Sequence, residues 1–295
     1  MPIDTIAQKI LQIIGSPPAE GHNSIFPLST VYSTTQHTMR SVIAPQTIAL
    51  LVLQGTKILT LQAESIRLHV GDMFMIPPQI EFTVENIPEA DTGQYLALCL
   101  TFDEKMLARV GALKNNESNL SPQRASMFRF LMTSDLDAAI ETVLNSIANY
   151  PQNHHLRSLY QEAVLTIIGE ETSCVPYLWE QAQSWQARCA FLFSMDPGYR
   201  WTITEVAERL GVGERSLRRH LQAEDIGFRE LLQATRLNAA LNRLQLGTEN
   251  VGEVAYRCGY ESASRFAGLF KQRFGITPSE LLRAYAVSEY SLTES

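Results

Sequence analysis

The chain has 295 residues, 45% of them hydrophobic, and its 24 Lys and Arg are outnumbered by 31 Asp and Glu, which leaves a formal net charge of -7. This length is typical of two domains, and the apolar content excludes a disordered chain. The acidic balance excludes a protein that coats nucleic acid or membranes through bulk positive charge, but it is compatible with a local basic face.

Residues 1–15 place apolar side chains at the period of a helix, which differs from the continuous apolar core of a signal peptide. No stretch reaches the roughly 18 consecutive apolar residues that a membrane span requires. The sequence therefore predicts a cytoplasmic protein with no membrane partner. The cysteines lack the paired spacing of a zinc or redox site and are predicted to be buried free thiols: Cys99, Cys174, Cys189 and Cys258.

Residues 24–103 have the pattern of short strands separated by turns. Gly55, the Gly71-Asp72 pair and the Pro77-Pro78 pair mark turns between them. This spacing predicts a small antiparallel sandwich or barrel. The predicted strands lie at 47–53, 57–61, 66–70, 73–76, 82–84 and 95–102.

From about residue 135 the apolar period becomes that of helices. Apolar stripes at 136–147 and 156–168 could pack either on the sheet or on a second copy of the chain, and both alternatives stay open. His154 and His155 lie next to Pro151 in a predicted loop. A third helix is predicted over 177–195, before the breaker Asp196-Pro197-Gly198. We therefore predict domains at 1–175 and 176–286, followed by a frayed tail at 287–295.

The C-terminal part contains an internal repeat at an offset of 48 residues. Each copy has the pattern of two short helices joined by a turn at Gly211 or Gly259, so two helix-turn-helix units are predicted at 202–223 and 250–272. The pairs that match at this offset are Glu205 with Glu253, Val206 with Val254, Ala207 with Ala255, Arg209 with Arg257, Gly211 with Gly259 and Gly227 with Gly275.

A capping box is predicted at Thr202 and Glu205, and Ser262 is predicted to cap the last helix of the second unit. A continuous helix over 228–246 would separate the two units by roughly 28 Å. Successive major-groove segments of a duplex recur at about 34 Å. One chain could therefore read two adjacent groove segments.

Residues 185–285 resemble the DNA-binding domain of the AraC/XylS family of bacterial transcription regulators. The resemblance rests on the ordered pair of units, on Val-Ala-Tyr-Arg-Cys-Gly-Tyr at 254–260 and on Phe-Lys-Gln-Arg-Phe-Gly-Ile-Thr-Pro at 270–278. Residues 24–103 are similar to the cupin-like regulatory domain of the same family at Gly55-Thr56-Lys57, Gly71-Asp72 and Pro77. The resemblance implies an α+β protein with an N-terminal cupin-like sandwich and flanking helices, and a C-terminal all-α domain of two units joined by a long helix.

The resemblance also places the DNA contacts. In the first recognition helix Leu217 and Leu221 point inward, so Arg215, Arg218 and Arg219 point outward, where the planar fork of arginine matches guanine edges or phosphate. Glu214 begins this helix and belongs to the same predicted surface. The first unit is therefore predicted to carry most of the base readout.

The second recognition helix has Gly268 where the family commonly has Arg, and glycine weakens a helix by about 1 kcal/mol relative to alanine. This unit is predicted mainly to position the protein on the DNA backbone. Its predicted base contacts are Ala263, Ser264, Arg265 and Ala267, and its predicted phosphate contacts are Lys271 and Arg273.

The regulatory part lacks the residues of a metal-dependent cupin. Metal-dependent cupins carry a His-x-His cluster and the motif Gly-x5-Pro-x-Gly-x2-His. Gly71 and Pro77 match the first two positions of this motif, but Gln79 and Phe82 stand where its second Gly and its His would be, and no His-x-His occurs. We predict no metal, no cofactor and no catalytic residue, and pocket residues for an effector cannot be read from the sequence. The expected partners are promoter DNA, RNA polymerase, a small-molecule effector and a second copy of the chain.

The sequence therefore predicts a DNA-binding transcription regulator, and more specifically an activator, that is cytoplasmic and nucleoid-associated when bound. Two alternatives remain open. One is a cupin-type enzyme with an appended DNA-binding module, and the other is a dimerising interaction protein that modulates another regulator.

Overall fold

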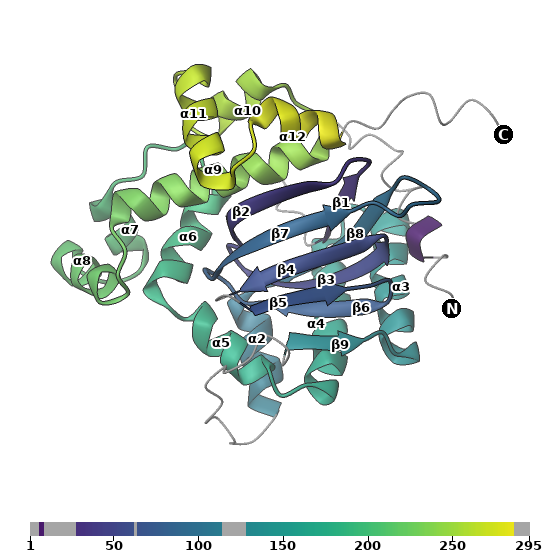
Figure 1. Cartoon of the computed structure of the whole chain (residues 1–295). Coiled ribbons are helices and arrows are strands. Elements are labelled where there is room, and N and C mark those ends of the chain that lie inside the picture. Colours follow the sequence, from purple (N-terminus) through teal and green to yellow (C-terminus); the bar gives the residue numbers. More distant parts are fainter. Residues whose placement is uncertain (1–5, 9–27, 62–63, 114–127, 286–295) are drawn as a thin grey trace.

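A computed structural model describes residues 6–8, 28–61, 64–113 and 128–285 (Figure 1). Its N-terminal part contains two antiparallel sheets that face one another. One sheet has the order β1-β8-β3-β6-β9 and the other β2-β7-β4-β5. The strands are β1 (Leu28–Ser33), β2 (His37–Ile43), β3 (Thr47–Gln54), β4 (Thr56–Leu61), β5 (Glu64–Leu68), β6 (Asp72–Ile76), β7 (Glu81–Ile87), β8 (Tyr95–Phe102) and β9 (Arg129–Leu131).

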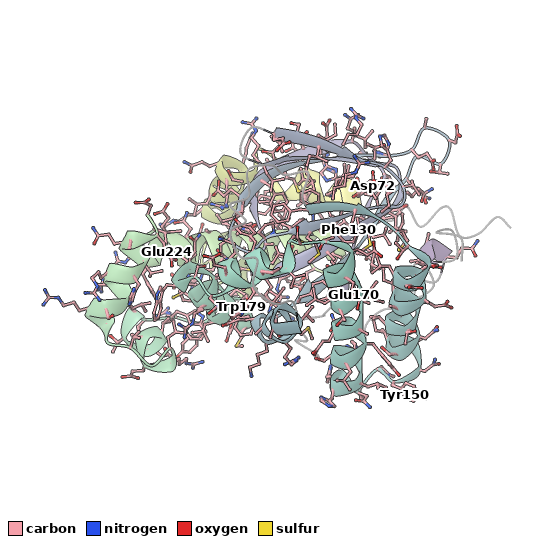
Figure 2. All side chains as sticks on the ribbon, turned by 90° about the horizontal axis from the view of Figure 1, so that it is seen from below. Asp72, Phe130, Tyr150, Glu170, Trp179 and Glu224 are labelled. Atoms are coloured by element: carbon pink, nitrogen blue, oxygen red, sulfur yellow. The ribbon has the colours of Figure 1, made fainter. Side chains whose placement is uncertain are left out.

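The predicted strands are confirmed to within a few residues, and their burial follows from their place in the sheets. Strand β3 is paired on both sides, with β8 and β6, and is almost wholly buried, as its continuous apolar run requires. Strand β4 alternates buried and half-buried residues because only one of its faces looks into the sandwich. Strand β9 was not predicted; it pairs with β6, and Figure 2 shows Phe130 and Asp72 on these neighbouring strands.

Four helices follow the strands: α2 (Glu104–Leu113), which was not predicted, α3 (Ser134–Asn149), α4 (His154–Glu171) and α5 (Val175–Ala182). Helix α4 packs against β8 of the first sheet, α2 and α3 pack against α4, and α5 packs against α2. The α3 stripe is buried in the same core as the sheets, through residues such as Ile140 and Val143. The α4 stripe is divided: Val164 and Ile168 are buried in this core, whereas Leu159 is 51% exposed and Ala163 is exposed as well. The chain's own core therefore accounts for the α3 stripe and for part of the α4 stripe, while the outer part of the α4 stripe is exposed. The predicted loop at His154 is wrong, because the Asn153 side chain accepts from the amide of Leu156 and starts α4 at His154.

The C-terminal part is helical: α6 (Trp185–Met195), α7 (Ile203–Arg209), α8 (Glu214–Ala223), α9 (Phe228–Leu246), α10 (Val251–Arg257), α11 (Ala263–Phe274) and α12 (Pro278–Tyr285). The single helix predicted over 177–195 is wrong. Two helices replace it, because the Ser184 side chain accepts from the amide of Ala187 and starts α6 afresh. Helix α5 packs against α2, whereas α6 packs against α8 and α9.

The two helix-turn-helix units belong to different hydrophobic cores. The first unit packs around Phe193, Leu217 and Leu221 with the start of α9, in a cluster of its own. The second unit, through Phe266 and Phe270, belongs to one continuous cluster with the two sheets. The regulatory sandwich is therefore packed onto the second unit (Figure 1). The expected helix over 1–15 lies largely outside the described residues, where only 6–8 are seen and are helical, and the tail at 287–295 lies outside them entirely.

Candidate nucleic-acid interface

Helix α8 presents the arginines of the first unit. Leu217 and Leu221 are buried against the unit's core, and Arg215, Arg218 and Arg219 are exposed on the other side, as the spacing predicts. The turn before α8 contains Gly211 with φ +70°, a left-handed conformation that favours glycine. Only half of the predicted capping box forms. Thr202 accepts from the amide of Glu205 at 3.3 Å, but the Glu205 carboxylate pairs with Arg209.

The three arginines differ in their partners. Arg218 donates to Glu214 at 2.8 Å, and Glu214 also accepts from the hydroxyl of Thr204 on α7. These two hydrogen bonds, that from Arg218 first, lower the pKa of Glu214. No acidic side chain of the described residues pairs with Arg215 or Arg219. Two of the three guanidinium groups are therefore available to an anion without breaking an ion pair.

The far end of α8 is fixed by contacts that sequence reasoning missed. Glu224, which follows α8, accepts from the first two amides of α6, at 2.9 Å from Trp185 N and 2.7 Å from Gln186 N (Glu224 is labelled in Figure 2). The rings of Trp185 and His220 stack at 4.3 Å with an interplanar angle of 9°. No sequence signal links these residues, because Glu224 lies 39 positions after Trp185. The contacts hold the recognition helix at a set angle to α6.

In the second unit the full capping box forms at α10, between Asn250 and Glu253. Ser262 caps α11 as predicted, accepting from the amide of Arg265 at 3.3 Å. Phe266, Phe270 and Phe274 lie on the inner face of α11 and are fully buried. The outer face exposes predicted contact residues: Ala263, Ser264, Arg265 and Lys271; Ala267 is half-buried.

Arg273, a predicted phosphate contact, lies against the regulatory part in this structure. Its guanidinium lies 2.9 Å from Glu81 of β7, and its side chain is only 18% exposed. This ion pair belongs to a larger contact between the second unit and the sandwich. Asn238 of α9 accepts from the amide of Ile43 at 2.9 Å, and the amide of Thr34 donates to Ala284 of α12. In this conformation Arg273 is committed to the regulatory part.

Arg236 joins the two halves of the DNA-binding part. It donates to the carbonyls of Pro197 and Tyr199, and it lies under the turn at Gly259, where an added Cβ would come within 2.9 Å of its guanidinium. Gly259 also has φ +80°, so this turn favours glycine for both reasons. Arg236 is therefore a structural residue here.

Three further observations concern the cysteines, clusters of metal-binding side chains and the apolar length of the helices. All four cysteines are buried free thiols, as predicted. Within the described ranges, no three His, Cys, Asp or Glu side chains gather as a metal site would require. Among the same residues, no helix is both long and apolar enough to cross a membrane.

Two family models match the chain. Residues 26–167 match the AraC-type transcriptional regulator N-terminus, and residues 206–284 match a helix-turn-helix domain. Together they cover about three quarters of the chain. The chain belongs to the AraC/XylS family. As an AraC-family protein, it has the predicted α+β architecture, with a regulatory part before a pair of helix-turn-helix units.

Curated relatives of this AraC-family protein include the urease operon transcriptional activator of Escherichia coli, 36% identical over 89 residues, and the transcriptional regulator SirC of Salmonella typhimurium, 38% identical over 84 residues. These alignments cover 30% and 28% of both chains. The regulator GadX of E. coli is 28% identical over 148 residues, 47% of this chain and 53% of the relative. The chain thus matches from less than a third to about half of the length of these relatives.

Solved structures support the fold over nearly the whole chain. ToxT from Vibrio cholerae O395 has a TM-score of 0.60 at 13% identity, covering 89% of this chain and 99% of that one. ToxT with a bound unsaturated fatty acid, from another V. cholerae strain, has a TM-score of 0.56 at 16% identity, covering 89% and 96%. At this identity the similarity establishes the arrangement of the two parts and no more.

Proposed function

We propose that this protein is a sequence-specific DNA-binding transcription regulator that activates its target promoters. The observation that carries the proposal is the outward face of α8, where Arg215 and Arg219 are exposed and unpaired with acidic residues of the described chain. Helix α8 belongs to the first of two helix-turn-helix units. These units lie at opposite ends of α9, whose 19 residues span about 28 Å. The names of relatives such as the urease operon activator support the direction of regulation.

The contact surface that we propose comprises Arg215, Arg218, Arg219 and Glu214 of the first unit and Ala263, Ser264, Arg265, Ala267 and Lys271 of the second. Arg215 and Arg219 read base edges, while Arg218 is oriented by Glu214 before DNA arrives. Arg273 joins the phosphate contacts only after it leaves Glu81. The predicted division at 175/176 falls at the start of α5 (Val175–Ala182). We propose a division between α5 and α6 instead, since α5 packs on α2 whereas α6 packs on α8 and α9.

Footprinting of the full chain on genomic DNA tests the proposal. Protection of two adjacent groove segments, roughly 10 base pairs apart from centre to centre, is the expected result. Protection no better than on random DNA would contradict it and would favour the interaction protein that modulates another regulator.

We further propose that the regulatory part senses a small-molecule effector. The match of residues 26–167 to the regulatory N-terminus and the ToxT structure with an unsaturated fatty acid support a sensing role. Native mass spectrometry of the purified protein, before and after exposure to a cell extract of small molecules, should show a bound mass that denaturation releases. No added mass under any condition would contradict the proposal.

RNA polymerase and a second copy of the chain are the proposed protein partners. The α3 stripe is buried in the chain's own core, so a dimer would use other surfaces, such as the exposed Leu159 and Ala163 of the α4 stripe. Sedimentation at micromolar concentration tests this, and a strictly monomeric profile would remove the dimer. We propose a cytoplasmic, nucleoid-associated protein that is no enzyme, as in its family; stoichiometric, tightly bound Fe, Zn or Mn would revive the enzymatic alternative.

A further inference from the structure

The recognition helix of the second unit contains a glycine that its fold does not require. Gly268 is the sixth of the twelve residues of α11, and an added Cβ there would have no neighbour within 4 Å. Its φ is not positive, so an L side chain could adopt the same backbone conformation. Glycine in a helix interior weakens the helix relative to alanine because it has more conformational freedom to lose.

Several other glycines of the described chain have a visible structural reason, although Gly111 of α2, like Gly268, has none. Gly211 and Gly275 adopt left-handed backbone conformations, with φ +70° and +79°. At Gly198 an added Cβ would lie 2.8 Å from the carbonyl oxygen of Arg257, and at Gly169 it would lie 3.1 Å from Val110. Gly268 meets neither condition, so the cost that it imposes on α11 has no compensation within the described chain.

Gly268 lies at the centre of the exposed face of α11. The residues exposed around it are Ser264, Arg265, Lys271 and Gln272, at spacings of three and four that place them on the same side of the helix. The buried phenylalanines, among them Phe266 and Phe270, occupy the opposite side. A missing side chain at this central point exposes the helix backbone itself and lets a partner approach it closely.

We propose that Gly268 is a positioning residue for DNA recognition. Its missing side chain lets the backbone of α11 seat deeply in the major groove, against an A·T pair whose thymine methyl fills the space. The thymine methyl is the apolar group that projects into the major groove, and it needs an apolar surface without a donor or acceptor. This inference rests on the proposed function and adds a base preference to the second unit.

The substitution Gly268→Ala distinguishes a role of the glycine in DNA binding from a role in stability, because the variant should be more stable but should bind its site more weakly. We expect a higher Tm than that of the wild type, since alanine stabilises the exposed helix. We expect at least tenfold weaker binding to a site that the wild-type protein protects, and unchanged binding to random DNA. Because α11 is stabilised, a loss of affinity cannot result from unfolding.

Gly111→Ala is the matched control. Gly111 lies in α2 of the regulatory part, and an added Cβ there also has no neighbour within 4 Å. It should raise Tm and leave DNA binding unchanged. A Gly268→Ala protein that is stabilised and binds like the wild type would overturn the proposal.

Replacement of each thymine of the second half-site by deoxyuridine, which lacks only the methyl group, tests the base preference directly. Wild-type affinity should fall about three- to tenfold at one position, and this loss should disappear in Gly268→Ala. Equal affinity for all deoxyuridine sites would overturn the thymine contact. A different result would contradict the proposed function: a wild-type protein that protects no specific DNA site at all.

Discussion

At the scale of single residues, the outward arginines of α8 are chemically alike but differ in their partners. Arg218 is held by Glu214, so it reaches a base only by giving up or sharing an ion pair. Arg219 has no such competitor among the described residues. On the second unit, Arg265 is the exposed arginine of the predicted base contacts. Readout should therefore depend more on the first unit than on the second.

Arg219→Ala is expected to weaken specific binding by 10- to 100-fold and to relax base preference at one position of its half-site, because a bidentate arginine contact is worth about 1–3 kcal/mol. Arg265→Ala should have a smaller effect on base preference. Gel shifts on a set of single-base variants of the site provide the measurement. Arg67→Ala, which removes an exposed positive charge from β5, is the control. A larger relaxation by Arg265→Ala would reverse the ranking of the units.

At the scale of single elements, strand β4 carries a charge into the sandwich. Lys57 is 4% exposed and donates to Asn86 of β7 at 2.6 Å, and no acidic residue of the described chain pairs with it. Burial lowers the pKa of Lys57 from 10.5 to about 8. The charged form is therefore less stable in the fold than in the unfolded chain, at a cost of about 3 kcal/mol at neutral pH.

Because the folded-state pKa of Lys57 is depressed, its contribution to the free energy of unfolding should rise between about pH 8 and pH 10.5, where only the unfolded chain still holds the proton. Lys57→Met should increase stability at pH 7 by about 1–3 kcal/mol and remove this rise. Urea unfolding at several pH values, compared with the wild type, measures both.

Only the difference between variant and wild type isolates Lys57, since burial also raises the pKa of Cys99 to about 11, which lowers stability above pH 9. Lys105→Met, at an exposed position of α2, controls for the loss of a lysine. Destabilisation by Lys57→Met at pH 7 would show that its hydrogen bond to Asn86 outweighs the cost of burying the charge.

At the scale of the whole molecule, the two cores divide the protein differently from its sequence domains. The second unit is attached to the sandwich, because Asn238, Arg273 and Ala284 bond to β2, β7 and the residue after β1. The first unit has a separate core. A conformational change in the sandwich should therefore reach the second unit directly. It should reach the first unit only through α9, which connects the two units.

Glu81→Ala should release Arg273 from β7 and so tighten DNA binding by about two- to fivefold at low salt. The slope of log affinity against log salt should become steeper by about 0.9, the value for one further phosphate contact. Glu85→Ala is the control: it removes the same charge from the same strand, but its partner is Gln36. Equal tightening by both variants would mean that only net charge changed.

The charge of the chain also divides between its parts. Residues 1–195 contain most of the excess acid, while residues 196–285 hold only slightly more Lys and Arg than Asp and Glu. Affinity should therefore depend on placed arginines and not on a broad positive field. Binding to random DNA should be weak and only modestly dependent on salt, and a steep salt dependence in titrations would contradict this.

Features that depend on neighbours within a few positions could be predicted from the amino-acid sequence. Apolar period, caps such as Ser262 and turn glycines such as Gly211 act locally, so most strands, the long helix α9 and both units could be predicted. The outward position of Arg219 followed from the same period. A resemblance in ordered motifs then pointed to the family.

Features that depend on contacts between distant segments became visible only in the folded chain. Folding placed the α3 stripe inside the chain's core and left Leu159 of the α4 stripe exposed. It also assigned α5 and α6 to different partners, and it paired Arg273 with Glu81, 192 positions away. The residues next to a side chain in the sequence indicate whether it faces outward from its helix. They do not indicate which other part of the chain it will contact. For this reason the sequence could predict the reading surface of the DNA-binding part but not its attachment to the regulatory part.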